Sequence, residues 1–241
     1  MSDRYQEGVS MNLQDYISRH EFLSPIIEAQ SIADRLVEAL DISIEFPSVE
    51  ECKALTADGV PVLQHDEILD RLNPFEGDTD REIFKSIIRQ EELDCDPMLR
   101  LIVWTMLERA VPEELKASET WATWRRNYCP ICGRRPVMAQ LRKEFQGRAR
   151  FMLCDGCHTM WEYNRLGCVY CGNDDLKSIH ILEIEAEPDI RLDVCDKCQA
   201  YLKTYNHEGE EQIYLNDRLT LHFDLLADDE HLIKHGSILT E

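Results

Sequence analysis

Apolar residues recur at helical spacing through the first half of the chain. Ser24 followed by Pro25 is typical of a helix start, and apolar residues then repeat at one face of a helix as far as Leu40. Three further helices are predicted, starting near Asp78 or Asp80, at Asp96 with Pro97, and at Pro112, the last running through Trp121 and Trp124 toward Arg126. Residues 1–126 are therefore expected to form a mostly helical domain.

After Asn127 the pattern changes to short apolar segments between paired cysteines. Three of these segments suit short strands: residues 149–153, 178–184 and 191–194. The chain is then predicted to close with a helix from Asp217 to His231 that buries Leu221, Leu225 and Leu226. The pattern as a whole predicts an α+β protein.

Four CxxC pairs follow one another in this second part: Cys129 and Cys132, Cys154 and Cys157, Cys168 and Cys171, and Cys195 and Cys198. Two intervening residues let a tight turn direct both sulfurs at one ion, and tetrahedral coordination needs two such turns. The pairs therefore predict two metal ions, each held by four thiolates. A closed shell of four sulfurs leaves no position for water or substrate, so each ion is expected to stabilise the fold and not to catalyse.

The four pairs form an internal repeat. Gly133 and Gly172 directly follow the first and third pairs, where a residue with positive φ helps to close the turn, whereas the second and fourth pairs lack that glycine. The repeat favours sequential pairing, with metal modules at residues 127–166 and 167–206 and an acidic C-terminal segment with a helix at 207–241. An interleaved arrangement, in which the first pair meets the third, stays open because the gaps between turns slightly exceed the usual ribbon spacing.

Other residues near the array have simpler interpretations. Cys52 and Cys95 lie outside it and are expected to be small buried side chains. His158 directly follows Cys157 and is an alternative ligand, although a surface or supporting position is favoured. Trp161 is expected to pack in the core of the first module and not to face a partner. Four thiolates suit zinc and a rubredoxin-like mononuclear iron equally well, so the ligands predict iron or zinc.

Charge is distributed unevenly along the chain. The sequence has 26 basic and 47 acidic residues, and the net charge of -21 disfavours a nucleic-acid partner. Basic side chains gather in the first module: Arg134, Arg135, Arg142, Lys143, Arg148 and Arg150. A solvated face is the favoured interpretation of this group, and docking of an acidic protein segment or of nucleic acid are the alternatives.

The sequence gives no sign of export or of a known catalytic motif. No N-terminal segment has the features of a secretory signal, and the longest apolar run, Leu101 to Leu107, is far too short to span a bilayer. We therefore expect a cytoplasmic protein without membrane insertion, in which ten cysteines indicate metal or redox chemistry instead of disulfides. Phosphate-binding, dinucleotide-binding, hydrolase and HExxH patterns are missing, so no catalytic residue is assigned and a non-enzymatic role is expected.

Four segments together resemble the FdhE family of formate dehydrogenase accessory proteins: CPICGRRP at Cys129–Pro136, CDGCHTMW at Cys154–Trp161, RLGCVYCG at Arg165–Gly172 and CDKCQAYLK at Cys195–Lys203. The resemblance implies a helical domain, two rubredoxin-like or zinc-ribbon-like modules whose eight paired cysteines bind iron or zinc, and a short C-terminal helix. It also implies a cytoplasmic maturation factor. Such a factor binds the catalytic subunit of a molybdenum- or tungsten-dependent formate dehydrogenase without becoming a stable part of the enzyme.

Two other functions fit the cysteine array itself. Thiolate-bound iron is redox-capable, so an electron-transfer or redox protein is one alternative. A nucleic-acid-binding zinc ribbon is the other, although the net charge counts against it. The acidic first half is also a poor match for an acidic client, unless the near-neutral cysteine region makes the contact.

Overall fold

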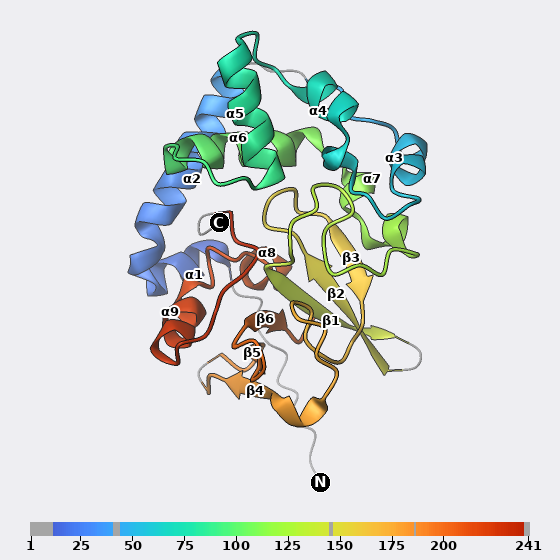
Figure 1. Cartoon of the computed structure of the whole chain (residues 1–241). Coiled ribbons are helices and arrows are strands. Elements are labelled where there is room, and N and C mark those ends of the chain that lie inside the picture. The colour runs from blue at the N-terminus through green and yellow to red at the C-terminus, as the bar shows by residue number, and fades with distance from the viewer. Residues whose placement is uncertain (1–11, 41–43, 145–146, 186, 239–241) are drawn as a thin grey trace.

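The computed structural model of the chain describes residues 12–40, 44–144, 147–185 and 187–238. Its α-helices are α1 Leu13–Arg19, α2 Ser24–Leu40, α3 Val49–Leu55, α4 Asp66–Leu72, α5 Asp78–Arg89, α6 Pro97–Ala110, α7 Glu113–Lys116, α8 Glu211–Tyr214 and α9 Leu221–Asp229. Short 3₁₀ helices lie between them: η1 Glu21–Leu23, η2 Val62–Gln64, η3 Ser118–Trp121 and η4 Leu176–Ser178. Figure 1 shows α3 to α6 gathered at one end of the molecule, beyond the sheet. None of the helices in the described ranges has the length and apolar character needed to cross a membrane.

Three of the predicted helices are confirmed. Helix α2 begins at Ser24, and α5 begins at Asp78. Helix α6 begins directly after Asp96, whose side chain accepts a hydrogen bond from the Met98 backbone N–H at 2.8 Å. This bond satisfies a donor that has no partner inside the helix, so the cap fixes where the helix starts.

The fourth predicted helix, from Pro112 to Arg126, is wrong in its extent. Helix α7 makes only one turn, because Ala117 is extended with ψ of 135°, and the short η3 follows. The Trp121 indole N–H donates to the Leu115 carbonyl at 2.8 Å, and the ring is buried. Burial of a large aromatic ring outweighs the weak local preference for a longer helix.

A single six-stranded sheet runs through both cysteine modules. Its strands are β1 Met138–Glu144, β2 Gly147–Leu153, β3 Met160–Tyr163, β4 Ile179–Glu183, β5 Ile190–Cys195 and β6 Tyr201–Tyr205, in the order β3-β2-β1-β6-β5-β4. Neighbours are antiparallel except for β1 and β6, which pair in parallel with Ala139 opposite Thr204. The three strands predicted from the sequence correspond to β2, β4 and β5. The parallel pair joins the two cysteine modules through backbone hydrogen bonds.

The closing helix exists, but at Leu221–Asp229 it is shorter than the predicted Asp217 to His231, and it buries a different face. Helix α9 buries Phe223 and Ala227, whereas Leu225 and Leu226 are 58% and 46% exposed. Phe223 packs against the aromatic core beside the sheet. The larger apolar surface of the phenylalanine ring therefore decides which side of the helix faces inward.

Two buried clusters hold the elements together. The larger one combines side chains of the helical part with all four cysteines of the first module and with Cys168 and Cys195 of the second. Backbone contacts reinforce it, because the Val62 and Leu63 N–H groups donate to the carbonyls of Pro130 and Ile131 at 3.0 and 2.8 Å. The smaller cluster lies between α1, β5, β6 and α9, and its largest members are Tyr16, Tyr201, Tyr205, Tyr214 and Phe223. The first cysteine turn is thus fixed directly to the helical part.

Candidate metal centres

All four CxxC pairs fold into the same turn. In each one, the residue after the second cysteine donates its backbone N–H to the carbonyl of the first cysteine, over 2.8 to 3.1 Å. That residue is left-handed every time, with φ of 81° at Gly133, 55° at His158, 72° at Gly172 and 57° at Gln199. The sequence pattern identified the two glycines and missed His158 and Gln199. Both residues occupy the same position in the repeat as the two glycines, and this position was the signal that could have predicted their left-handed backbone.

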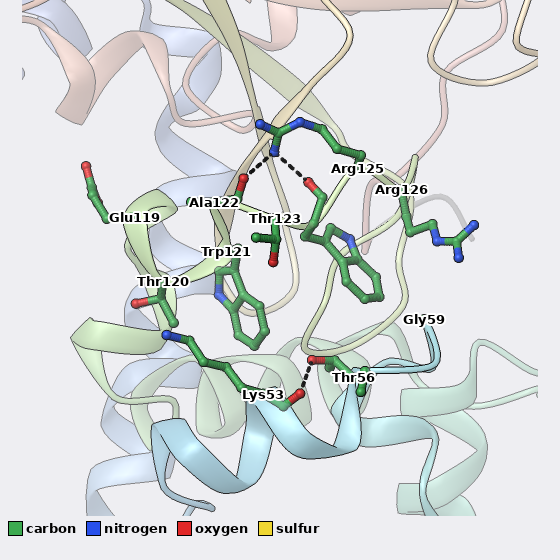
Figure 2. Close-up of a pocket in the computed structure, with 12 residues that line it drawn as sticks. Lys53, Thr56, Gly59, Glu119, Thr120, Trp121, Ala122, Thr123, Arg125 and Arg126 are labelled. Atoms are coloured by element: carbon green, nitrogen blue, oxygen red, sulfur yellow. Dashed lines mark hydrogen bonds between the residues drawn. The ribbon is translucent and has the colours of Figure 1, made fainter.

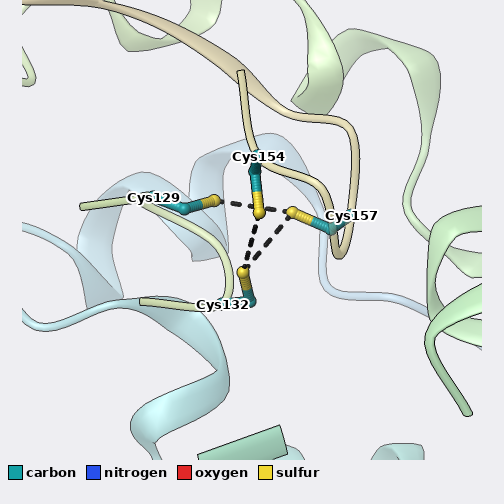
Figure 3. Close-up of side chains that lie close together, drawn as sticks. All are labelled: Cys129, Cys132, Cys154 and Cys157. Atoms are coloured by element: carbon teal, nitrogen blue, oxygen red, sulfur yellow. Dashed lines mark hydrogen bonds between the residues drawn. The ribbon is translucent and has the colours of Figure 1, made fainter. Parts of the chain in front are cut away.

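A second backbone hydrogen bond closes each turn. The N–H of the first cysteine donates to the carbonyl five residues later, and the bonds join Cys129 to Arg134, Cys154 to Thr159, Cys168 to Asn173 and Cys195 to Ala200 over 2.8 to 3.1 Å. The chain therefore reverses tightly around the pair. Both sulfurs of a pair point to the same side, as Figure 3 shows for the first two turns.

The first cluster brings together four buried sulfurs. The Sγ atoms of Cys129 and Cys157 are 3.5 Å apart, those of Cys132 and Cys154 are 3.3 Å apart, and those of Cys132 and Cys157 are 3.7 Å apart (Figure 3). Sulfurs around a tetrahedral ion with ~2.3 Å bonds lie ~3.8 Å from one another. The donor set therefore fits one zinc or iron ion after small side-chain rotations.

The second cluster has the same composition but lies nearer the surface. The Sγ atoms of Cys168 and Cys198 are 3.6 Å apart, and those of Cys171 and Cys195 are 3.8 Å apart. Cys171 is exposed and Cys198 is half-buried, whereas all four cysteines of the first cluster are fully buried. The sulfurs are thus grouped in the sequential arrangement, and the two clusters differ in their access to solvent.

Each cluster contains thiols with a raised pKa and one with a lowered pKa, Cys157 in the first and Cys195 in the second. Burial raises the pKa of the Cys129 and Cys132 thiols well above the usual value. Burial also acts to raise the pKa of the Cys195 thiol, but hydrogen bonds from backbone N–H groups and from the Asn173 amide outweigh it and lower this pKa to about 7. Burial likewise raises the pKa of the Cys198 thiol to about 12, so loading of either cluster must displace protons, because a metal ion binds the thiolate form.

The neighbouring residues have structural positions. His158 Nδ1 lies 3.0 Å from a carboxylate oxygen of Glu108, so this ring pairs with an acid and does not join the sulfurs. Trp161 is fully buried, as expected, and its indole N–H donates to the Arg126 carbonyl at 2.9 Å. Cys52 is buried in the helical core, where burial raises the pKa of its thiol to about 12.

The basic side chains of the first module do not share one surface. Arg134 is 2% exposed, donates to the Ser237 carbonyl at 2.8 Å and lies over the Trp104 ring. Arg150 is 4% exposed and donates to the carbonyls of Asn164 and Gly167. Two of the six cationic side chains are therefore buried and hydrogen-bonded within the protein. This weakens the two interpretations in which the group binds an acidic protein segment or nucleic acid.

A pocket of about 500 Å³ lies between α3 and the segment around η3 (Figure 2). Its wall includes Lys53, Trp121, Trp124, Arg125 and Arg126. Three polar groups of this wall already have partners: both indole N–H groups donate to backbone carbonyls, and the Arg125 guanidinium donates to two carbonyls of its own turn. No ligand is assigned to this pocket.

Known proteins match part of this chain. A family model described as "FdhE, central domain" matches residues 128–165, which include the first cluster. The "Protein FdhE homolog" of Aquifex aeolicus is 35% identical over 116 residues, covering 46% of this chain and 40% of that protein. The homologue of Rhizobium meliloti is 33% identical over 115 residues, covering 45% and 37%. The chain thus matches well under half the length of these curated relatives.

A solved structure is similar in fold. The crystal structure of the FdhE protein from Pseudomonas aeruginosa matches 90% of this chain and 87% of its own chain, with a TM-score of 0.53 and 17% sequence identity. This similarity extends over the helical part as well as the sheet. The predicted α+β architecture, with a helical N-terminal part and two four-cysteine modules, is therefore confirmed.

Proposed function

We propose that this chain, whose first cysteine module matches the central domain of the FdhE family, is an accessory protein that binds the catalytic subunit of a formate dehydrogenase and assists its assembly into active enzyme. The protein would act in the cytoplasm and would leave the enzyme once assembly is complete. The observation that carries the proposal is the match of the first cysteine module to the family's central domain.

The geometry of the clusters supports a role in binding and not in catalysis at the metals. Each cluster offers four sulfurs, which complete a tetrahedral shell and leave no position for substrate. The ions would therefore hold the sheet and its turns in one shape. A rigid sheet that spans both modules supplies a stable surface for a client protein.

Copurification and complementation test this proposal together. A tagged chain is isolated without air from cells that make a formate dehydrogenase, and we expect its catalytic subunit to copurify. A strain that lacks the protein should have little formate dehydrogenase activity, which the wild type should restore. The variant Cys168→Ser should restore less, whereas Cys95→Ser, outside both clusters, should match the wild type. Full enzyme activity in the strain without the protein would refute the proposal.

An electron-transfer role is the second candidate, because the second cluster is accessible. Cys171 is exposed, so an iron ion in this cluster would lie close enough to the surface to exchange electrons with a partner. Metal analysis decides this alternative. Zinc has no redox chemistry in such a site, and two zinc ions per chain would therefore eliminate it.

A further inference from the structure

Three side chains from distant parts of the sequence meet outside the cysteine clusters. His20 lies at the C-terminal end of α1, Glu187 lies in the loop between β4 and β5, and His222 lies in the first turn of α9. A ligand atom of each lies within 4.8 Å of the others. His222 Nε2 is 2.7 Å and His20 Nε2 is 3.7 Å from the same Glu187 oxygen, Oε1.

The His20 ring is held in a metal-binding orientation. Its Nδ1 lies 2.9 Å from the Tyr16 carbonyl, which accepts a hydrogen bond only if Nδ1 carries the proton. The neutral ring then presents the lone pair of Nε2 toward Glu187. Histidines that bind metals commonly use their other ring nitrogen in this way, and a backbone carbonyl is one of the usual acceptors.

The other two side chains carry buried polar atoms that lack hydrogen-bond partners among the described residues. These atoms are Nδ1 and Nε2 of His222 and Oε2 of Glu187. His222 Nε2 lies close to Glu187 Oε1, but the two atoms do not meet the geometry of a hydrogen bond. Buried polar atoms normally have partners. A cation between the two groups would satisfy the nitrogen and the carboxylate at once.

The spacing suits a small divalent ion. Ligand atoms around a tetrahedral zinc ion with ~2.0–2.1 Å bonds lie ~3.4 Å apart, and the distances of 2.7 and 3.7 Å lie on either side of that value. The rings of His20 and His222 stack with centroids 5.2 Å apart and planes tilted by 22°. The three side chains are 16% to 20% exposed, so the cluster lies just below the surface.

We propose that His20, Glu187 and His222 bind one divalent transition-metal ion, with zinc as the ion that best suits two imidazoles and one carboxylate. This third site differs from the cysteine clusters because its ligands are nitrogen and oxygen. The ion would connect α1 and α9 to the loop between β4 and β5, and so would fasten both helices to the second cysteine module. Since three protein ligands leave coordination positions open, binding should be weaker than in the closed clusters.

The test counts the metal ions on intact protein. Tag-free protein that carries its cysteine-bound ions is incubated with excess zinc, desalted and examined by native mass spectrometry. We expect three ions per chain in the wild type and two in His20→Ala, in His222→Ala and in Glu187→Gln. The matched control is His207→Ala, because exposed His207 also pairs with a single carboxylate, that of Asp189, but belongs to no cluster. This variant should keep three ions.

The same spectra show whether each variant is folded, because a folded chain retains the two cysteine-bound ions. Thermal unfolding gives a second measurement. Added zinc should raise the Tm of the wild type and of His207→Ala, and should leave the Tm of His222→Ala unchanged. A wild type that saturates at two ions would overturn the proposal, and so would cluster variants that still bind three.

Discussion

His158 and Gln199 have the same left-handed backbone conformation, with φ of 55° and 57°, and each directly follows the second cysteine of a CxxC pair. Gly133 and Gly172 hold this position in the other two turns, with φ of 81° and 72°. Left-handed backbone costs a residue with a side chain roughly 1–2 kcal/mol. Two turns therefore carry a conformational cost that the two glycine turns avoid.

Alanine at the two glycine positions should separate this conformational cost from packing. At Gly172 an added Cβ meets no atom within 4 Å, so Gly172→Ala should lower the free energy of unfolding only by the cost of the left-handed backbone, about 1 kcal/mol. At Gly133 the Cβ would lie 3.2 Å from Pro61 and 3.3 Å from Gln64, so Gly133→Ala should cost more. Urea unfolding of the metal-loaded proteins measures both free energies. Equal losses would show that packing around Gly133 is irrelevant.

The features that the sequence predicts correctly are local ones. Asp96 caps α6 and the paired cysteines make turns because each depends on residues only a few positions apart. The fourth helix could not be predicted, because its length depends on where Trp121 is buried. The burial of Arg134 could not be predicted either, because its hydrogen-bond partner Ser237 is 103 residues away in the sequence.

The cysteine ligands of the two centres could be predicted from the sequence, but the packing and solvent access around them could not. Cysteine spacing favours the sequential grouping of the sulfurs but leaves an interleaved one open, and it does not reveal that β1 pairs with β6 in parallel, joining the modules. It also gives no measure of solvent access. The difference between buried Cys132 and exposed Cys171 depends on packing against the helical part, which involves all four cysteines of the first module but leaves Cys171 outside.

A chelator should remove the second ion first. Cys171 is exposed, whereas the first cluster is enclosed by the helical core, so the second ion is the one a chelator can approach without unfolding. Release into a coloured chelator should therefore have two phases of equal amplitude. The variant Cys168→Ser should show the slow phase alone. A single phase in the wild type would contradict this difference between the clusters.

Lys203 should be essential for stability, because it is a fully buried cation. Its Nζ lies 2.5 Å from Asp217 Oδ1 and 3.0 Å from Asp224 Oδ2. Replacement by methionine leaves two buried carboxylates with Lys234 as their remaining cation, which should cost about 3–5 kcal/mol of unfolding free energy. The control Lys143→Met changes an exposed lysine and should stay within about 0.5 kcal/mol. Similar losses for the two variants would argue against a buried ionic network.

The protein should lose stability at alkaline pH through its buried tyrosines. Burial raises the pKa of Tyr214 to about 12, above its ordinary value of 10.0. Between these values the unfolded chain releases the phenolic proton and the folded chain keeps it, so the stabilisation is complete below pH 10 and falls by about 1.4 kcal/mol per pH unit above it. Urea unfolding over this interval should give a shallower decline for Tyr214→Phe than for the wild type. Identical slopes would show that Tyr214 ionises equally in both states.

The most direct test of the two four-thiolate centres is X-ray absorption at the metal edge, combined with a metal count. Tag-free protein is purified without air and dialysed against metal-free buffer. We expect two iron or zinc ions per chain, each surrounded by four sulfur atoms at about 2.3 Å with no nitrogen or oxygen. One ion per chain, or nitrogen and oxygen among the ligands of these two ions, would contradict the assignment of the eight cysteines.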